Sequence, residues 1–253
     1  MPAHQLAIVT GTSSGIGDAL TRMLLQREWR VVGISRRPAP IASPLYSHLP
    51  LDLGDVDGLT ATLTSRLGPV VADAAVRRLA LVNNAADVAL LGQVDQLEPA
   101  GMLKAYAVNV VAPVLLSGWL LRSAAPGVPL RIVNLSSGAA VVPLPGLGAY
   151  SATKAALRMA GMVLAAELDV RHPPAGPSRD VSIWSYEPGV VETPMARAVR
   201  NSSAETLPVV HWFQQLAANK KLRTPEDPAK EIADYVEADG HPRFAEQQSV
   251  IEQ

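Results

Sequence analysis

Short runs of β-branched and aliphatic residues alternate along the chain with longer stretches of helical spacing, and this alternation constrains the fold more than any other feature. The runs cover residues 6–10, 31–35, 79–83, 131–136 and 181–186, and residues 151–170 have helical spacing. Parallel strands need crossover connections, usually helices, whereas antiparallel strands can be joined by tight turns. We therefore predict an α/β fold, a doubly wound parallel sheet flanked by helices, with ligands at the carboxyl ends of the strands.

Size and composition favour one folded domain over residues 1–253. A chain of 253 residues suits one large α/β domain, and 48% hydrophobic against 18% charged residues is too apolar for a disordered chain. The proline-rich segments 37–50 and 173–177 are predicted to be loops within that domain, not linkers between domains.

The charge balance and the missing cysteines exclude several functions. A net charge of −1 without a basic run argues against nucleic acid as a partner. Without cysteine there is no disulfide, thiolate metal site or Cys nucleophile, and the five histidines form no spaced pair, so we expect no metal. The most apolar stretch, 110–121, is too short to span a membrane. No signal-peptide pattern precedes the first strand, so we expect a cytoplasmic protein without a membrane partner.

Glycines cluster directly after the first predicted strand, where the first helix begins. Their spacing is G-x-x-x-G-x-G, which differs from the G-x-G-x-x-G of many dinucleotide sites. Glycine permits a tight turn and a close approach to a pyrophosphate at a helix N-terminus. The segment predicts a pyrophosphate site, although an ordinary structural turn would also contain such glycines. The expected contacts are Gly11, Ser13, Ser14, Gly15, Ile16 and Gly17.

The second predicted strand ends in Ser35-Arg36-Arg37. At this place dinucleotide folds carry either an acid for a ribose hydroxyl or an arginine for a 2′-phosphate. The acid is absent, so Arg36 or Arg37 is expected to favour NADP(H) through charge-assisted hydrogen bonds. Two solvated loop arginines are the alternative.

Polar residues follow the other strands at the same sheet edge. Asn83 ends the third strand and Ser137 follows the fourth, while Tyr150 and Lys154 lie four residues apart at the start of the next helix. Residues four apart share one helix face, so the tyrosine and lysine can act together. A solvated pair would have the same spacing.

Taken together, these motifs resemble the short-chain dehydrogenase/reductase family. The resemblance rests on T-G-x-x-x-G-x-G at 10–17, Asn83-Asn84-Ala85, Asn109, Ser137, Tyr150-x-x-x-Lys154 and Pro188-Gly189-x-Val191-x-Thr193, in the order of the family. It covers nearly the whole chain and implies a Rossmann-like fold. One departure is Ala86, which stands where the family usually has glycine and adds a methyl group where close approach is expected.

The resemblance implies a catalytic group of Asn109, Ser137, Tyr150 and Lys154. Tyr150 would protonate a carbonyl oxygen as hydride arrives, and Lys154 would lower the tyrosine pKa and hold the nicotinamide ribose. Ser137 would donate to the substrate carbonyl, and Asn109 would hold a water in the proton relay. The alternatives are that Ser137 caps a turn and that Asn109 is a satisfied buried polar group.

Further cofactor contacts follow from the same resemblance. Asp52 would contact the adenine amino group, although a helix cap or turn role is also open. Val191 and Thr193 would lie at the nicotinamide carboxamide, where an ordinary Pro-Gly turn is the alternative. The expected cofactor residues in this group are Ser35, Asp52, Leu53, Asn83, Ala85, Tyr150, Lys154, Pro188, Gly189, Val191 and Thr193.

Several loops resemble the bacterial benzil reductases and the sepiapterin reductases. In sepiapterin reductases an Asp near the C-terminus anchors the pterin, whereas the tail 240–246 has no Asp and Glu246 is its nearest acid. This departure favours an apolar ketone or 1,2-diketone. Residues 194–223 are expected to form a substrate lid, with a helix packed on the core as the alternative. The expected pocket residues are Leu90, Leu144, Leu147, Trp212 and Phe213.

These observations predict an NADPH-dependent carbonyl reductase acting on a small molecule. The alternatives within the family are a sepiapterin-like reductase, a 3-oxoacyl reductase and an alcohol dehydrogenase. A dinucleotide-sensing module without turnover is the alternative from another class. Small residues in 151–168 fit a homodimer or homotetramer, as the family resemblance implies, and equally fit packing of this helix on its own sheet.

Overall fold

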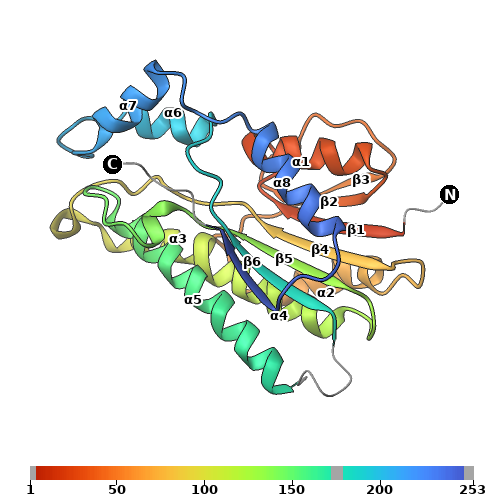
Figure 1. Ribbon diagram of the computed structural model, residues 1–253. Coiled ribbons are helices and arrows are strands. Elements are labelled where there is room, and N and C mark those ends of the chain that lie inside the picture. Colours follow the sequence, from red (N-terminus) through yellow and green to blue (C-terminus); the bar gives the residue numbers. More distant parts are fainter. Residues whose placement is uncertain (1–3, 172–178, 248–253) are drawn as a thin grey trace.

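The computed structural model describes residues 4–171 and 179–247 of the chain and contains one parallel sheet (Figure 1). The strand order is β3-β2-β1-β4-β5-β6-β7, and every neighbouring pair is parallel. The predicted doubly wound α/β fold is therefore confirmed. The order reverses between β1 and β4, the position where such sheets bind ligands. The strands are β1 Gln5–Thr10, β2 Arg30–Ser35, β3 Tyr46–Pro50, β4 Arg78–Asn83, β5 Leu130–Leu135, β6 Val181–Tyr186 and β7 Phe244–Gln247.

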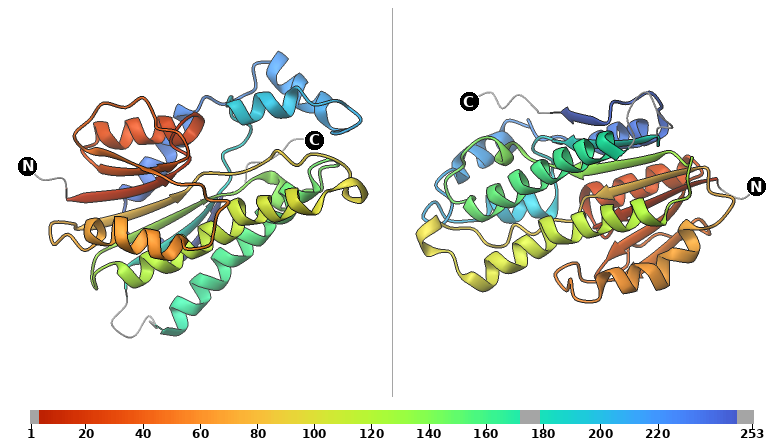
Figure 2. Two further views of the ribbon diagram at one scale, coloured as in Figure 1. Left: turned by 180° about the vertical axis from the view of Figure 1, so that it is seen from behind. Right: turned by 90° about the horizontal axis from the view of Figure 1, so that it is seen from below.

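Helices cover both faces of the sheet (Figure 2). On one face, α1 (Gly15–Gln26) and α8 (Glu226–Glu237) enclose a core with Leu20, Leu24 and Ile232. On the other face, three helices share the larger core: α2 (Leu59–Val71), α4 (Ala112–Ser123) and α5 (Gly148–Arg171).

The inner strands are buried on both faces because their side chains alternate between the two cores. In β5, Ile132 packs with the α4 and α5 side and Val133 with the α1 and α8 side. In β6, Ile183 and Trp184 divide in the same way. Burial on both faces explains why these strands are continuous apolar runs in the sequence.

Shorter elements lie around the carboxyl ends of the strands. Two helices, α6 (Pro194–Arg200) and α7 (Val210–Ala218), stand over this edge (Figure 1). The remaining elements are η1 Val94–Gln96, α3 Pro99–Tyr106, the π-helical turn η2 Ala107–Val111 and η3 Gly138–Ala140. Helices therefore form about half of the predicted lid segment 194–223.

The proline-rich segments 37–50 and 173–177 were both predicted to be loops. The prediction that 37–50 is a loop is wrong at its end, because Tyr46–Pro50 forms strand β3 beside β2. Proline is tolerated there because β3 is an edge strand and Pro50 is its last residue. The predicted loop 173–177 lies outside the described residues.

The apolar helix through α4 is longer than the sequence suggested. The helical run Pro99–Ser123 has 25 residues and by length and composition alone is apolar enough to cross a membrane, whereas the sequence argument considered only the stretch 110–121. Ala112, Leu116 and Leu120 of this run are buried in the core against the sheet. It is a core helix of the α/β fold.

Candidate active site

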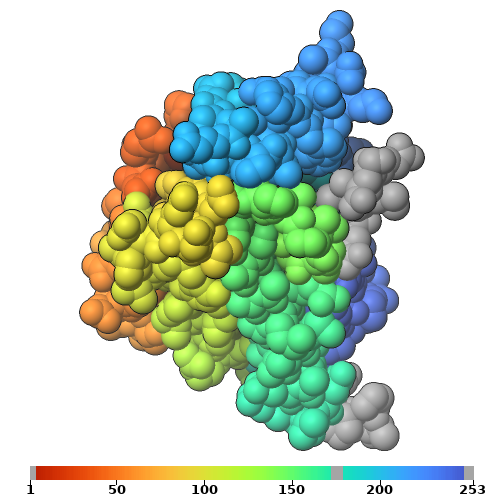
Figure 3. All heavy atoms as spheres, turned by 90° about the vertical axis from the view of Figure 1, so that its left-hand side faces the viewer, coloured from red at the N-terminus to blue at the C-terminus, as the bar shows by residue number. Residues whose placement is uncertain are grey.

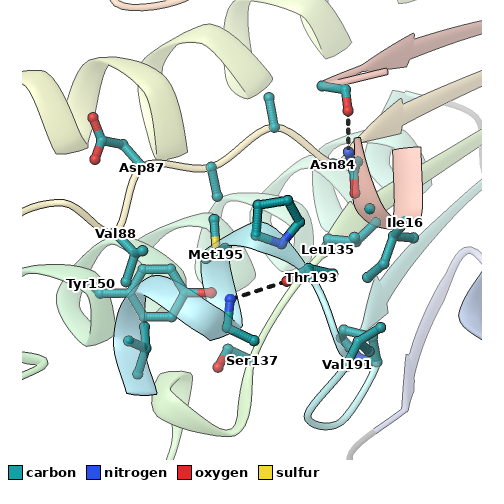
Figure 4. Close-up of a pocket in the computed structure, with 18 of the residues that line it drawn as sticks. Ile16, Asn84, Asp87, Val88, Leu135, Ser137, Tyr150, Val191, Thr193 and Met195 are labelled. Carbon is teal, nitrogen blue, oxygen red and sulfur yellow. Dashed lines mark hydrogen bonds between the residues drawn. The ribbon is translucent and has the colours of Figure 1, made fainter. Parts of the chain in front are cut away.

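A cavity of about 850 Å³ opens at the carboxyl ends of the strands. One end is lined by Arg36, Arg37 and Asp52 from the β2 and β3 side of the sheet, and the other by Ser137 and Tyr150 from the β5 side. Figure 4 shows Tyr150 and Ser137 at one end of the drawn part of the cavity, with Ile16 and Asn84 farther along it. The cavity is elongated enough to take a dinucleotide and a small molecule together.

The glycine-rich turn closes the cavity beneath the start of α1. Gly11 and Gly15 have φ of +74° and +60°, which glycine adopts without strain. A Cβ on Gly17 would lie 2.3 Å from the Gly11 carbonyl oxygen, so this glycine permits the turn to pack on the helix. Gly17 itself does not line the cavity, whereas Gly11, Ser13, Ser14, Gly15 and Ile16 do. The Ser14 N-cap makes no side-chain hydrogen bond to the helix, and the first-turn residues face the cavity.

The arginines after β2 are exposed and line the cavity. Within the described part of the chain, neither Arg36 nor Arg37 forms an ion pair. Ser35 holds their loop, because its hydroxyl donates to the Arg37 carbonyl at 2.7 Å. The guanidinium groups of Arg36 and Arg37 are therefore available to bind an anion in the cavity.

Asp52 and Leu53 line the same end of the cavity. The Asp52 Oδ1 accepts a hydrogen bond from the Gly54 amide at 2.9 Å, so the carboxylate also stabilises a turn. The two interpretations of Asp52 are compatible, since its second oxygen is free of that turn.

Asn83 was expected at the cofactor, but the structure places its side chain in the protein interior. Its Nδ2 donates to Asn134 Oδ1 at 2.8 Å, and the residue does not line the cavity. Asn83 is still a strand residue directed into the core, and the chain reaches the edge only at Asn84. Asn84, which the cofactor prediction omitted, lines the cavity together with Ala85, and its Nδ2 donates to the Thr10 carbonyl at 2.8 Å.

Ser137, Tyr150 and Lys154 come together where β5 meets the start of α5. The Ser137 hydroxyl accepts from the Ala139 amide at 3.2 Å, which caps η3, and also forms a side-chain hydrogen bond with Tyr150. Ser137 therefore caps a turn, as the alternative predicted, and at the same time contacts Tyr150. Lys154, which is 2% exposed, donates from Nζ to the Leu135 carbonyl at 2.7 Å, and this Nζ lies 5.5 Å from the centroid of the Tyr150 ring.

Burial disfavours the charged forms of both α5 residues. It raises the pKa of Tyr150 to about 12, with the charge of Glu187 adding to the rise and the Ser137 hydrogen bond opposing it. Burial also lowers the pKa of Lys154 to about 8. The raised pKa of Tyr150 is opposite in direction to the shift expected from the Lys154 ammonium, and burial is its largest cause.

Asn109 lies in the π-helical turn and is 1% exposed. Its Oδ1 accepts from the Asp87 amide at 2.7 Å, and its Nδ2 donates to the Asp87 carbonyl at 2.8 Å and to Thr153 Oγ1 at 3.0 Å. The side chain does not line the cavity. It ties the loop after β4 to α5, as the alternative of a satisfied buried polar group predicted.

The end of the cavity beside Tyr150 is apolar. Leu144, Leu147, Trp212 and Phe213 line it as predicted, and the two aromatic rings meet edge to face with centroids 4.8 Å apart. Val88, Met195, Val199 and Leu216 also line the cavity and were not predicted. Figure 3 shows the blue surface of the α6 and α7 region lying directly over the yellow and green surfaces that contain α3 and the start of α5.

Leu90 is not part of this wall. Its side chain packs on α3, since a Cβ on Gly101 would lie 2.8 Å from Leu90 Cδ1. Val88, two residues earlier, packs with the cluster of Leu147 and Tyr150 instead. Sequence position alone could not decide which aliphatic residue of the loop turns inward.

The segment after β6 joins the two parts of the cavity. Pro188, Gly189, Val191 and Thr193 line it as predicted. Thr193 caps α6 by accepting from the Ala196 amide at 3.1 Å (Figure 4). A Cβ on Gly15 would lie 3.1 Å from Thr193 Cγ2, so this segment closes on the glycine-rich turn.

Several charged residues of the wall were not predicted. Asp87 lies 3.6 Å from Lys104, and Arg223 pairs with Glu231, while Glu187 is buried near Tyr150. Within residues 4–171 and 179–247 no cluster of three or more His, Cys, Asp or Glu could hold a metal ion.

Glu246, the acid nearest to the expected pterin anchor, lies in β7 and does not line the cavity. It forms a two-pronged ion pair with Arg158 of α5, in which Arg158 Nη2 lies 2.8 Å from Oε2. A pterin anchor of the sepiapterin reductase kind is therefore not formed by this residue.

Comparison with known proteins places the chain among oxidoreductases. Residues 5–204 match the family model described as short chain dehydrogenase. A benzil reductase ((S)-benzoin forming) from Bacillus cereus is 31% identical over 244 residues, covering 93% of this chain and 95% of that protein. Carbonyl reductase [NADPH] 2 from Sus scrofa is 32% identical over 236 residues, 91% of this chain and 85% of that protein. A sepiapterin reductase from Bos taurus is 30% identical over 218 residues, 79% of this chain and 78% of that protein.

Among solved structures, a short-chain dehydrogenase/reductase from Burkholderia vietnamiensis is 33% identical with a TM-score of 0.67. The match covers 81% of this chain and 94% of that one. The predicted resemblance, including that to the benzil and sepiapterin reductases, is confirmed. The chain belongs to the short-chain dehydrogenase/reductase family.

Proposed function

We propose that the protein is an NADPH-dependent reductase of apolar ketones or 1,2-diketones. The observation that carries this proposal is the position of Ser137, Tyr150 and Lys154 in one elongated cavity, between an apolar end and an end lined by free guanidinium groups. A carbonyl compound fits the apolar end, and a phosphorylated dinucleotide fits the remainder.

The residues present fit a nicotinamide dinucleotide. The start of α1 offers uncapped first-turn amides beside glycines with positive φ, which suits a pyrophosphate. Asp52 and Leu53 would hold the adenosine, Lys154 the nicotinamide ribose, and Val191 with Thr193 the carboxamide. When bound, the nicotinamide supplies hydride to the carbonyl carbon.

The proton for the carbonyl oxygen would come from Tyr150. Its raised pKa keeps the phenol protonated at neutral pH, so the group is ready to donate. Ser137 donates a hydrogen bond to the same oxygen and stabilises the charge that develops there. Solvent then returns the proton to Tyr150, past Lys154, which holds the phenolate by its charge. Asn109 acts as a positioning residue, because it fixes the Asp87 loop against α5.

The preference for NADPH over NADH rests on Arg36 and Arg37. Both line the cavity and lie next to the expected ribose, and no acid stands at the end of β2 to bind a 2′-hydroxyl. The carbonyl reductase from Sus scrofa has NADPH in its name, which is consistent with a preference for NADPH here.

The substrate class rests on the apolar wall and on the benzil reductase relatives. The test is the rate of NADPH oxidation with benzil, followed at 340 nm, with benzoin identified as the product. A fast rate with NADPH and a slow rate with NADH is expected. No rate with benzil or other apolar ketones, despite NADPH binding, would overturn the substrate class and direct the search to pterins, acyl thioesters and alcohol oxidation. Failure of all of these would favour a dinucleotide sensor.

We also propose a homodimer that forms through α4 and α5. Met159, Val163 and Val170 of α5 are 53%, 49% and 83% exposed and lie on one helix face, and Val114 of α4 is 44% exposed. Light scattering after size exclusion should give twice the chain mass for the wild type and a monomer for Val163→Lys with Met159→Lys. A wild-type monomer would contradict the proposal. We further propose that residues 1–253 form one domain, which limited proteolysis can test. We also propose a cytoplasmic location, which cell fractionation can test.

A further inference from the structure

The edge strand β3 carries two polar side chains, Tyr46 and His48, that the proposed reaction does not use (Figure 1). They are two residues apart, so they lie on the same face of the sheet. Tyr46 packs against the core under α1 and α8, which identifies that face. Neither residue lines the cavity, so any effect on a bound molecule must act through other residues.

The His48 ring contacts Ser35, the last residue of β2. Its Nε2 lies 2.9 Å from the Ser35 carbonyl oxygen and 3.1 Å from Ser35 Oγ. A carbonyl oxygen only accepts hydrogen bonds, so Nε2 carries a hydrogen and His48 is the donor. The Ser35 hydroxyl in turn donates to the Arg37 carbonyl at 2.7 Å. His48 therefore fixes both the carbonyl and the hydroxyl of the residue that holds the arginine loop.

A chain of hydroxyl groups connects Ser35 to the glycine-rich turn and to Tyr46. Tyr46 Oη lies 3.3 Å from Thr12 Oγ1, and Thr12 Oγ1 lies 3.3 Å from Ser35 Oγ. Thr12 is fully buried, and a Cβ on Gly33 would lie 2.5 Å from Tyr46 Oη and 2.6 Å from Thr12 Oγ1. Glycine at this position of β2 therefore makes room for the contact. Ser35 is held both from β3 and from the turn before α1.

Ser35 is the residue at which this network meets the cavity. It lines the cavity together with Arg36 and Arg37, whose side chains are exposed. An exposed arginine loses rotamer freedom when it binds an anion, and a backbone that is already fixed avoids the further cost of ordering the loop. A ligand that contacts these arginines therefore depends on the support of Ser35, whereas a ligand that does not reach them is insensitive to it.

We propose that His48 is a positioning residue for cofactor selection, which acts through Ser35 to present the arginine loop to the 2′-phosphate of NADPH. The inference rests on the proposed preference for NADPH and adds to it a residue outside the cavity. NADH lacks the 2′-phosphate, so its binding does not depend on the arginine loop. Loss of the His48 donor should weaken NADPH binding about fivefold, the effect of one hydrogen bond, and change NADH binding by less than about twofold.

The test compares three substitutions of His48 by the dissociation constants of NADPH and NADH, measured by calorimetric titration. The side-chain amide of Gln can donate from nearly the place of Nε2, whereas that of Asn is one methylene shorter and Leu has no donor. His48→Gln should keep the ratio of the two constants within about twofold of the wild type, and His48→Asn and His48→Leu should lower the preference for NADPH about fivefold. Retained NADH binding shows that a variant is folded.

The matched control is Ser47→Ala, because Ser47 lies between Tyr46 and His48 on the same strand, is exposed and points to the opposite face of the sheet. Its ratio should equal that of the wild type. The inference is overturned if His48→Asn and His48→Leu leave the ratio unchanged or weaken the binding of both cofactors equally. It is also overturned if His48→Gln loses as much preference as His48→Leu, since the donor is then without effect.

The wild type separates this inference from the proposed function. If it binds NADPH no more tightly than NADH, the proposed cofactor preference fails. Hydrogen exchange of the protein without cofactor then still tests the position of the loop. The amides of residues 35–37 should exchange faster in His48→Leu than in the wild type and in His48→Gln, and equal exchange in all three contradicts the inference.

Discussion

Replacing the buried Lys154 by Met should stabilise the protein at neutral pH while removing its activity. The fall in the Lys154 pKa from its ordinary value of 10.5 to about 8 means that the fold disfavours the charged amine. Each tenfold change in proton affinity is worth about 1.4 kcal/mol, so burying this charge costs about 3 kcal/mol below pH 8. Met fills a similar volume without charge but loses the hydrogen bond to the Leu135 carbonyl, which is worth about 1 kcal/mol.

The expected gain in the free energy of unfolding is therefore about 2 kcal/mol at pH 7, measured by urea denaturation without cofactor. Because the folded pKa is lowered, the destabilisation by Lys154 is complete below pH 8 and disappears as pH rises from 8 to 10.5. The gain of Lys154→Met should accordingly shrink above pH 8 and change sign before pH 10.5, once the remaining cost of burying the charge falls below the roughly 1 kcal/mol of the lost hydrogen bond. Lys104→Met, in the same cavity but 54% exposed, should show no such trend. A stability difference that does not vary with pH would show that burial does not disfavour the charged form of Lys154.

Two further substitutions test the cofactor end of the cavity. Gly17→Ala would place a Cβ 2.3 Å from the Gly11 carbonyl oxygen and 2.5 Å from Asn84 Nδ2, so it should lower the free energy of unfolding by about 2 kcal/mol and weaken NADPH binding. Unchanged thermal unfolding would contradict this role of Gly17. Arg36→Ala or Arg37→Ala should raise KM for NADPH about tenfold or more and leave KM for NADH unchanged, since a charge-assisted hydrogen bond to phosphate is lost. If neither variant changes the ratio of the two KM values, the arginines do not bind a phosphate.

The sheet was predictable because its inner strands are buried on both faces and therefore appear as uninterrupted apolar runs. Strand β3 was not, since Tyr46–Pro50 is an edge strand with polar residues and a terminal proline. Its pairing with β2 depends on tertiary contacts that the local sequence does not encode.

In the candidate site, backbone positions were easier to predict than side-chain directions. Residues held by backbone geometry, such as Gly11 and Gly15, lie where their spacing predicted. Side-chain direction in loops was less predictable, since Val88 turns into the cavity and Leu90 turns toward α3. The alternation of side chains along β4 could have shown that Asn83 points into the protein interior. The prediction that Asn83 binds the cofactor did not consider this alternation.

The pKa of Tyr150 could not be predicted from the spacing of Tyr150 and Lys154. Spacing shows that an ammonium is near, which lowers a phenol pKa, but not how deeply both groups are buried. Burial raises the pKa of Tyr150 to about 12, so the phenol is protonated at neutral pH, as the proposed role of proton donor requires.

The role of Tyr150 as the acid is tested most directly by comparing the wild type with Tyr150→Phe in NADPH oxidation with benzil. We expect kcat to fall by about 10²- to 10⁴-fold while the dissociation constant of NADPH changes little, since Phe keeps the ring and removes the acidic proton. A variant that retains a near wild-type kcat would contradict the assignment of Tyr150 as the acid and, with it, the proposed mechanism.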